Sequence, residues 1–390
     1  ATNELYVLAG SVLGGANKSI WMQDPSKSAN TGKLVVEAGA QLKGDVYLFV
    51  TAGSTEWPVE VSIASSALVD GSQVLSANVP AGLDVVEKDG NWVVEYGVEV
   101  NGNEIAVSNA GGLKWIAQQV NSGADYFAGK TVVLTADIDL KGEEWTPIGS
   151  ISVDHGFMGN FDGKTYTIKN LAIKDITPDA DGYVYGGLFG LTEGVDKDNQ
   201  NYIKNLTIEN VDIETTGHIV AAAIAYPYYT VLENIKVKGN VSIKGGDYTS
   251  GVLSYTRRCV DAKNISINGN AGSVIEGNNT IGGVISDIQM NGGLVANYSN
   301  FNATGVTVKG VNCVGGISGI ISRQTLDGAT VKNVTIVCDD NRKGIVAGSL
   351  GDTSTIKNVS YENVTGATNI VGATYKDGSA VTKDGDVYTK

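Results

Sequence analysis

The chain has 390 residues, of which 42 are Asp or Glu and 28 are Lys or Arg, so its formal net charge is -14. A chain this acidic repels phosphate, which argues against nucleic acid and anionic membrane surfaces as partners. The hydrophobic content of 42% suffices for a core, and no apolar run approaches the roughly 18 residues of a membrane span. The 51 glycines and six prolines favour many short strands with tight turns over a helical bundle.

Residues 1–104 contain alternating apolar segments that predict strands, among them 33–37, 45–50 and 92–96. The segment 87–94 carries an Asp-Gly-Asn turn and predicts a hairpin. We interpret residues 1–104 as a small separate β-rich region. The alternative is that they form extra, irregular rungs of the domain that follows.

The next predicted element is an amphipathic helix over residues 109–122, capped by Ser108 or Asn109 and ended by Gly123. Because a stack of strands has a bare apolar end, we expect this helix to be the N-terminal cap of the following domain. Four apolar residues carry the helical spacing: Leu113, Ile116, Ala117 and Val120.

A strand at 131–140 is the expected first rung, and from residue 168 one short phrase recurs at intervals of 25 to 41 residues. The phrase places an apolar residue on each side of a central Asn or Gly, and a second phrase of two small residues and an apolar residue interleaves with it. Both phrases alternate apolar and polar residues, as half-buried strands do. The central positions are Asn170, Asn205, Asn234, Asn264, Gly305, Asn333 and Asn358.

Each unit is too small to bury its own apolar face, so stacking is required. We therefore predict an all-β fold, a right-handed parallel β-helix (solenoid) over residues 105–375, with 376–390 as a C-terminal tail or cap. The central asparagines are expected to form an amide ladder. The short, Gly-broken phrases fit no helical period, and propeller blades need about 40–50 residues. One internal column is expected to hold Leu206, Ile235, Ile265, Val306, Val334 and Val359.

The segments 134–140, 145–149, 157–163, 166–171 and 186–190 resemble GLUG-motif, pectate-lyase-like β-helix surface proteins of the Bacteroidetes type. The resemblance covers roughly residues 100–375. It implies an extracellular or cell-surface, adhesin-like protein of bacterial origin, either secreted or a lipoprotein. The mode of anchoring stays open, because no lipobox cysteine is present.

The functional hypothesis rests on Tyr and Arg residues in the corner loops, with Tyr183 and Tyr185 in an earlier loop. Aromatic faces beside Arg suit sugar rings or a protein partner, although rings that merely cover the loop bases are the alternative. We predict a monomeric, non-enzymatic protein that binds glycan or a surface protein and needs no cofactor. The candidate ligand-binding residues are Tyr226, Tyr228, Tyr229, Tyr255, Arg257, Arg258, Tyr298 and Arg323.

Two other functions stay open: a polysaccharide lyase or glycoside hydrolase, and a structural spacer. A hydrolase needs paired carboxylates about 5–9.5 Å apart, but the candidate aspartates stand at different offsets from the repeat phrase, so we assign no catalytic residue. A lyase would have to use Arg257, Arg258 or Arg323. The aspartates are Asp247, Asp261, Asp287, Asp327 and Asp352.

Metal sites have little support. Cys259, Cys313 and Cys338 are far apart and without a CxxC motif, so buried thiols are expected rather than zinc or disulfides. Partial calcium patterns at 179–182 and 196–200 lack the full twelve-residue loop, and we interpret their aspartates as turn residues. Ten Asn-x-Ser/Thr triplets are interpreted as structural.

Overall fold

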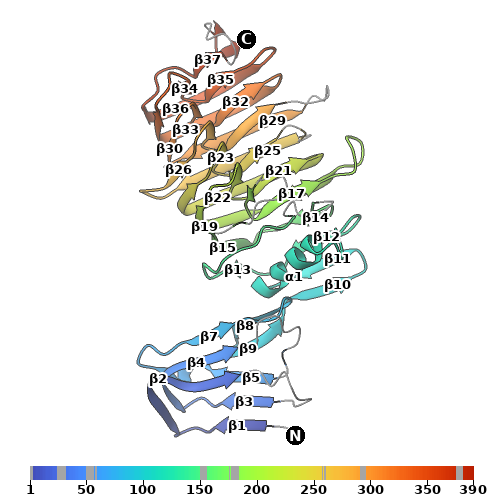
Figure 1. Cartoon of the computed structure of the whole chain (residues 1–390), viewed down its shortest axis with the longest axis vertical. Coiled ribbons are helices and arrows are strands. Elements are labelled where there is room, and N and C mark those ends of the chain that lie inside the picture. Colours follow the sequence, from blue (N-terminus) through green and yellow to red (C-terminus); the bar gives the residue numbers. More distant parts are fainter. Residues whose placement is uncertain are drawn as a thin grey trace. The chain divides into compact units, whose positions relative to one another are not determined.

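The chain is nearly all β, and in the computed structural model its strands stack in parallel as a β-solenoid of about 11 turns (Figure 1). This confirms the predicted fold class. The structure describes residues 3–23, 32–49, 57, 59–149, 156–174, 176, 184–256, 258, 261–289, 296–374 and 381–390. Two compact units are present: unit 1 comprises residues 1–99 and 107–115, and unit 2 comprises residues 100–106 and 116–390.

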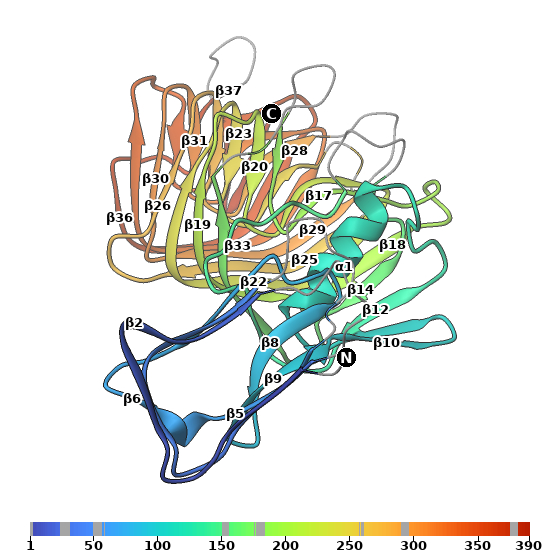
Figure 2. The ribbon, with the colours of Figure 1, turned by 60° about the horizontal axis from the view of Figure 1, so that its bottom comes forward.

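Unit 1 consists of parallel rungs closed by an antiparallel hairpin (Figure 2). One sheet has the order β1 (Asn3–Val7), β3 (Gly32–Val36), β5 (Val59–Ala64), β9 (Asn91–Tyr96) and β8 (Leu83–Lys88), with the first three strands parallel. The other sheet pairs β4 (Gln41–Phe49) in parallel with β2 (Val12–Gln23), β6 (Leu68–Val69) and β7 (Val74–Ala77). A 3-10 turn, η1, covers Ser65–Ala67.

The rungs of unit 1 enclose a core of their own, in which Leu34, Leu42 and Ile63 are fully buried. That residues 1–104 form a separate β-rich region, rather than extra rungs of the domain that follows, stays a prediction. The predicted hairpin is confirmed, since Asp89 and Gly90 join β8 to β9 with φ of 50° and 75°. Positive φ at both central residues is the mark of the turn that suits the twist of a hairpin.

Helix α1 (Ala110–Asn121) confirms the predicted helix. Its four predicted apolar residues are buried, and Asn109 is its N-cap, because its Oδ1 accepts the N–H of Gly112 at 3.0 Å. Gly123, with φ of 73°, follows the last turn. At the C-terminal end, Asn121 accepts the N–H of Gly149 at 2.9 Å and donates to the Pro147 carbonyl at 2.9 Å. That α1 caps the stack stays a prediction.

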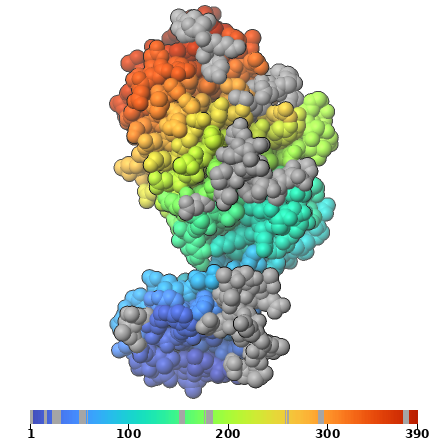
Figure 3. Space-filling view, in the orientation of Figure 1, coloured from blue at the N-terminus to red at the C-terminus, as the bar shows by residue number. Residues whose placement is uncertain are grey.

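Unit 2 runs through three sheets whose coils follow one another as successive colour bands in Figure 3. Sheet 1 is made of β10 (Val98–Asn101), β11 (Glu104–Val107), β12 (Thr131–Leu134), β13 (Ile138–Asp139), β14 (Asn160–Asp162), β15 (Thr167–Ile173), β18 (Asn201–Lys204), β19 (Thr207–Glu214), β22 (Thr230–Lys244), β25 (Asp261–Gly269), β26 (Val274–Glu276), β29 (Asn297–Thr304), β30 (Thr307–Gly310), β33 (Thr325–Cys338), β36 (Thr355–Thr365), β38 (Thr382–Asp384) and β39 (Val387–Thr389). The last two strands form a hairpin that pairs antiparallel with β36.

Sheets 2 and 3 complete each coil before the chain returns to sheet 1. Sheet 2 is made of β16 (Tyr185–Gly186), β20 (Ile219–Ala221), β23 (Tyr248–Ser250), β27 (Thr280–Gly282), β31 (Cys313–Gly315) and β34 (Lys343–Gly344). Sheet 3 is made of β17 (Phe189–Glu193), β21 (Ile224–Tyr228), β24 (Leu253–Tyr255), β28 (Ile285–Gln289), β32 (Ser318–Ser322), β35 (Ala347–Leu350) and β37 (Val371–Thr374).

The predicted amide ladder is present, but it is two ladders. In the first, Asn234 Nδ2 donates to Asn205 Oδ1 at 3.0 Å, Asn264 donates to Asn234 at 2.9 Å, and Asn300 donates to Asn264 at 3.0 Å. In the second, Asn210 donates to Asn170 at 3.2 Å and Asn363 donates to Asn333 at 3.0 Å. The bend asparagines have φ between 52° and 60°, the left-handed region that Asn tolerates better than other non-glycine residues.

Because there are two ladders, the prediction that six apolar residues stack in one internal column is wrong in part. Asn170, Gly305 and Asn333 occupy the bend of the second ladder, so Val306 and Val334 are not stacked on Ile265. Strand register places Phe301 and then Ala329 above Ile265 in their stead. Both bends need the same left-handed backbone, and therefore both select the same Asn-centred phrase.

Candidate functional site

Six tyrosines from sheets 2 and 3 form one surface group, which we call the tyrosine cluster. All of them are half-buried, and each occupies a strand or the residue directly after it. Four of the six were predicted as ligand-binding residues, and Tyr185 was noted in an earlier loop. The members are Tyr185, Tyr226, Tyr228, Tyr229, Tyr248 and Tyr255.

Tyr226 lies at the centre of the tyrosine cluster. Its ring stacks on that of Tyr185, with centroids 5.9 Å apart and planes 9° from parallel. It meets Tyr255 edge to face at 5.3 Å and Tyr228 edge to face at 6.0 Å. Tyr248 contacts Tyr255 at 4.8 Å, which joins sheet 2 to sheet 3 a second time. These are the offset and perpendicular arrangements that aromatic pairs prefer.

Arg258 supplies the positive charge of the tyrosine cluster. Its guanidinium carbon is 4.8 Å from the Tyr228 ring centroid, a cation–π distance, and the two residues form a parallel bridge. The Arg258 carbonyl accepts the N–H of Tyr229 at 2.8 Å, and the Tyr229 ring contacts that of Tyr228 at 4.7 Å. The predicted residue Arg257 lies outside the described residues, as does Tyr183.

Two predicted residues lie elsewhere. Tyr298 is 1% exposed, and its hydroxyl is 3.3 Å from both the carbonyl and the hydroxyl oxygen of Thr256, so it is a core residue rather than a surface contact. Side chains alternate between the two faces of β29, and Tyr298 falls on the buried face. The comparison of corner loops treated Tyr298 as a loop residue and therefore missed this alternation. Arg323 is exposed at the corner after β32, three strands from β21 in sheet 3, with φ of 58°.

Tyr248 is the cluster residue that sequence reasoning missed. Strand register aligns it with Ile219 and, one coil further back, with Tyr185. Aligning the residues just before the small-residue phrases would have revealed the repeated tyrosine. The corner-loop comparison began after those phrases and therefore passed over it.

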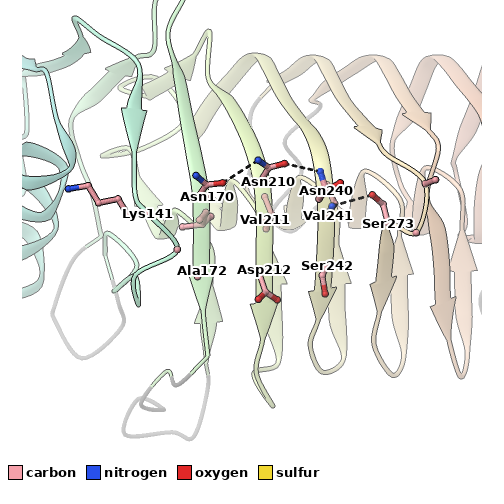
Figure 4. A pocket seen from close by; sticks show the side chains of 14 residues that line it. Lys141, Asn170, Ala172, Asn210, Val211, Asp212, Asn240, Val241, Ser242 and Ser273 are labelled. Atoms are coloured by element: carbon pink, nitrogen blue, oxygen red, sulfur yellow. Dashed lines mark hydrogen bonds between the residues drawn. The ribbon is translucent and has the colours of Figure 1, made fainter. Parts of the chain in front are cut away.

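A groove of about 740 Å³ crosses several coils of sheet 1 at the second ladder, and we call it the amide groove (Figure 4). The side chains of Ala172, Asp212 and Ser242 follow one another along its wall in strand register. Asp212 accepts from the Lys174 ammonium at 2.7 Å, so its charge is paired. The lining also includes the amides of Asn170, Asn210 and Asn240, which lie in a second row across the same strands.

The amide groove offers hydrogen-bonding groups to a polar ligand. The charge of Asp212, its acidic side chain, is neutralised by Lys174. The Asn210 Oδ1 accepts the Asn240 N–H at 3.0 Å, and Asn270 donates to Asn240 Oδ1 at 3.0 Å. Sequence reasoning did not predict this groove, because it follows the second asparagine bend and one bend per coil was expected.

The aspartates considered for hydrolysis do not stack on one another. Register sets Asp261 beside Val231 and Asn297, and Asp287 beside Tyr255 and Ile320. A third aspartate belongs to the first ladder: Asp327 accepts the Asn358 amide at 2.6 Å and pairs with Lys357 at 3.0 Å. These two contacts lower the pKa of Asp327.

No group of three or more His, Cys, Asp or Glu suited to a metal ion occurs within the described part of the chain. Asp196 Oδ1 accepts the N–H of Asp198 at 2.7 Å and that of Asn199 at 2.9 Å, as turn aspartates do. These hydrogen bonds lower the pKa of Asp196. The predicted calcium pattern at 179–182 lies outside the described residues.

Cys313 and Cys338 are buried free thiols, and burial raises the pKa of both, as expected for inert cysteines. Cys259 lies outside the described residues. No described helix combines the length and the apolar character that a membrane crossing requires.

Comparison with known proteins identifies no family for this chain. No family model matches, and no curated protein matches. The resemblance to GLUG-motif proteins therefore stays a prediction. The fold is similar to the crystal structure of a candidate immunoglobulin A1 protease from Bacteroides ovatus, with a TM-score of 0.43 and 19% sequence identity, over 72% of this chain and 82% of that chain. At this TM-score the likeness carries no argument about activity.

Proposed function

We propose that this chain is an extracellular or cell-surface, adhesin-like binding protein that recognises glycan or a surface protein through the tyrosine cluster. The observation that carries the proposal is the packing of half-buried tyrosine rings from two sheets on one face, with the Arg258 guanidinium above Tyr228. Tyrosine and arginine are the residue types that dominate binding energy at recognition surfaces.

The chemistry of the tyrosine cluster suits a ligand with both apolar faces and polar edges. Ring contacts hold each tyrosine in place, so little side-chain entropy is lost when a ligand binds. The Tyr hydroxyls and the Arg258 guanidinium supply hydrogen-bond donors beside the ring faces. A pyranose ring has this combination of C–H faces and hydroxyl edges, and so has a Tyr-rich protein surface.

The test is a glycan array on the intact chain, followed by calorimetry on the best ligand. We expect Tyr228→Ala with Arg258→Ala to weaken binding at least about tenfold, the effect of losing one well-packed anchor. Tyr361→Ala is the matched control, because Tyr361 is 57% exposed on β36 and belongs to no described ring pair of the tyrosine cluster. Binding that survives the double change as well as it survives the control would refute the proposal.

The same preparation separates binding from catalysis. Incubation with pectins, other uronans and host glycans, read by unsaturated products and new reducing ends, is expected to give no turnover. Products that depend on Arg258 or Arg323 would favour the lyase, and an array without any ligand would favour the spacer.

A further inference from the structure

Unit 1 carries a second aromatic surface, distant in sequence from the tyrosine cluster. Trp21 on β2 stacks on Tyr47 on β4, with centroids 5.7 Å apart and planes 21° from parallel. Phe49 meets Trp21 edge to face at 5.0 Å. The Lys18 ammonium lies 3.3 Å from the Trp21 centroid and 4.4 Å from that of Tyr47. We call these four residues the Trp21 platform.

The Trp21 platform lies on the outer face of its sheet. Trp21 and Tyr47 are register partners, and the residues beside them, Ile20, Val46 and Leu48, are buried in the core of unit 1. Because successive side chains of a strand point to opposite faces, Trp21 and Tyr47 point outward. Trp21 is 53% exposed, so a large apolar surface faces solvent.

Lys18 gives this surface its chemical preference. Within the described part of the chain its ammonium forms no ion pair, and it rests on two ring faces instead. By contrast, Lys33 on the neighbouring sheet pairs with Glu60 at 2.7 Å. In a chain with a net charge of -14, an ammonium that rests on exposed rings is complementary to an anionic ligand group.

We propose that the Trp21 platform binds a sugar that carries a carboxylate, such as a uronic or sialic acid residue of a glycan. The sugar ring stacks against Trp21 and Tyr47, and its carboxylate accepts a charge-assisted hydrogen bond from Lys18. This site is separate from the tyrosine cluster and does not depend on the function proposed for it.

The test uses the intact chain with two matched probe pairs: tetragalacturonate against its methyl ester, and sialyllactose against lactose. We expect at least one acid to bind, to change tryptophan fluorescence, and to lose affinity as salt is added. Trp21→Ala should weaken binding of that acid about tenfold or more. Trp21→Phe keeps an aromatic face, so it should weaken binding less, although it should also abolish the fluorescence change. Lys18→Gln should weaken the acid about tenfold and leave its neutral partner unchanged.

The controls lie on the same unit. Tyr6→Ala removes an aromatic ring that is 48% exposed on β1, and Lys43→Gln removes an exposed lysine from β4. Both should bind the acid as the unmodified chain does. The proposal is overturned if neither acid binds at millimolar concentration, if acid and neutral probe bind equally, or if Lys18→Gln matches Lys43→Gln. Tyr228→Ala in the tyrosine cluster should leave acid binding intact, so failure of either site is recognised separately.

Discussion

Asn264 occupies the middle of the first ladder, and its replacement measures what a ladder residue contributes. Its Nδ2 donates to Asn234 at 2.9 Å, its Oδ1 accepts from Asn300 at 3.0 Å, and its φ is 58°. Ala removes both hydrogen bonds and also places an ordinary Cβ in the left-handed region. Gly removes the hydrogen bonds but accepts this φ without strain.

The magnitudes follow from these two losses. Two hydrogen bonds at about 1 kcal/mol each, with about 1–2 kcal/mol for the left-handed backbone, predict that Asn264→Ala lowers the free energy of unfolding by about 3–4 kcal/mol. Asn264→Gly should cost about 2–3 kcal/mol, since the hydrogen bonds are lost and the more flexible unfolded chain adds about 0.5–1 kcal/mol. Urea unfolding followed by circular dichroism measures both values.

The matched control is Asn268→Ala, because Asn268 is an exposed asparagine of the same strand, β25, outside the ladder. Its cost should stay within about 0.5 kcal/mol, as for ordinary surface changes. If Asn264→Ala costs no more than this control, the stabilising role given to the ladder is wrong. If Asn264→Ala costs less than Asn264→Gly, the cost assigned to the left-handed backbone is wrong.

Three more predictions test other parts of the stack. Gly305→Asn should destabilise unit 2, because a Cβ there would lie 2.3 Å from a backbone oxygen. Gly328→Asn should cost less, because the nearest atom to its Cβ is a side-chain oxygen at 2.9 Å, which can move more easily than backbone; urea midpoints compare the two. Burial alone would raise the pKa of Asp162, but hydrogen bonds from Asn205 and a backbone N–H, with nearby lysines, hold it below its ordinary value. Its contribution to stability is therefore full above about pH 4 and is lost as pH falls through the folded-state pKa, so Asp162→Asn should lower the urea midpoint at pH 7 and the gap should narrow at pH 3. Cys313, buried and with a raised pKa, should resist iodoacetamide in the folded chain and react in urea, as peptide mass spectrometry will show; equal rates would contradict its burial.

The parallel stacking could be predicted because each Asn-centred phrase encodes the same local structure, a left-handed bend flanked by apolar residues that point inward. The register between coils could not, since Asn170 and Asn205 satisfy that requirement equally well while occupying different bends. Because successive phrases can occupy either bend, the number of residues between them is irregular. Only the hydrogen-bonded pairing of whole strands separates the two ladders.

The candidate site shows the same division. Tyr226, Tyr228 and Tyr255 were recognised because repeated aromatic residues follow the small-residue phrases. Tyr298 was misplaced because its sequence neighbourhood resembles theirs, while the pleat of β29 turns its ring into the core. The Trp21 platform was not predicted, since its pairing of β2 with β4 contains register shifts that no repeat phrase reports.

The tyrosine cluster lies beside a corner at which the coils differ in the length of their connections. The connection from sheet 3 to sheet 1 has one residue between β21 and β22, and seven between β28 and β29. The first ladder nevertheless keeps its hydrogen bonds at 2.9–3.0 Å, although the residues it joins are 30 positions apart in one coil and 36 in another. Extra residues at this corner therefore leave the hydrogen-bond lengths of the ladder unchanged. Tyr229 and Arg258 lie on this connection, and Tyr228 directly precedes it, so the rings and the guanidinium are presented at a corner where the chain length differs between coils. Tyr228→Ala should consequently abolish binding and lower the urea midpoint less than Asn264→Ala does, whereas Asn264→Ala should leave binding unchanged.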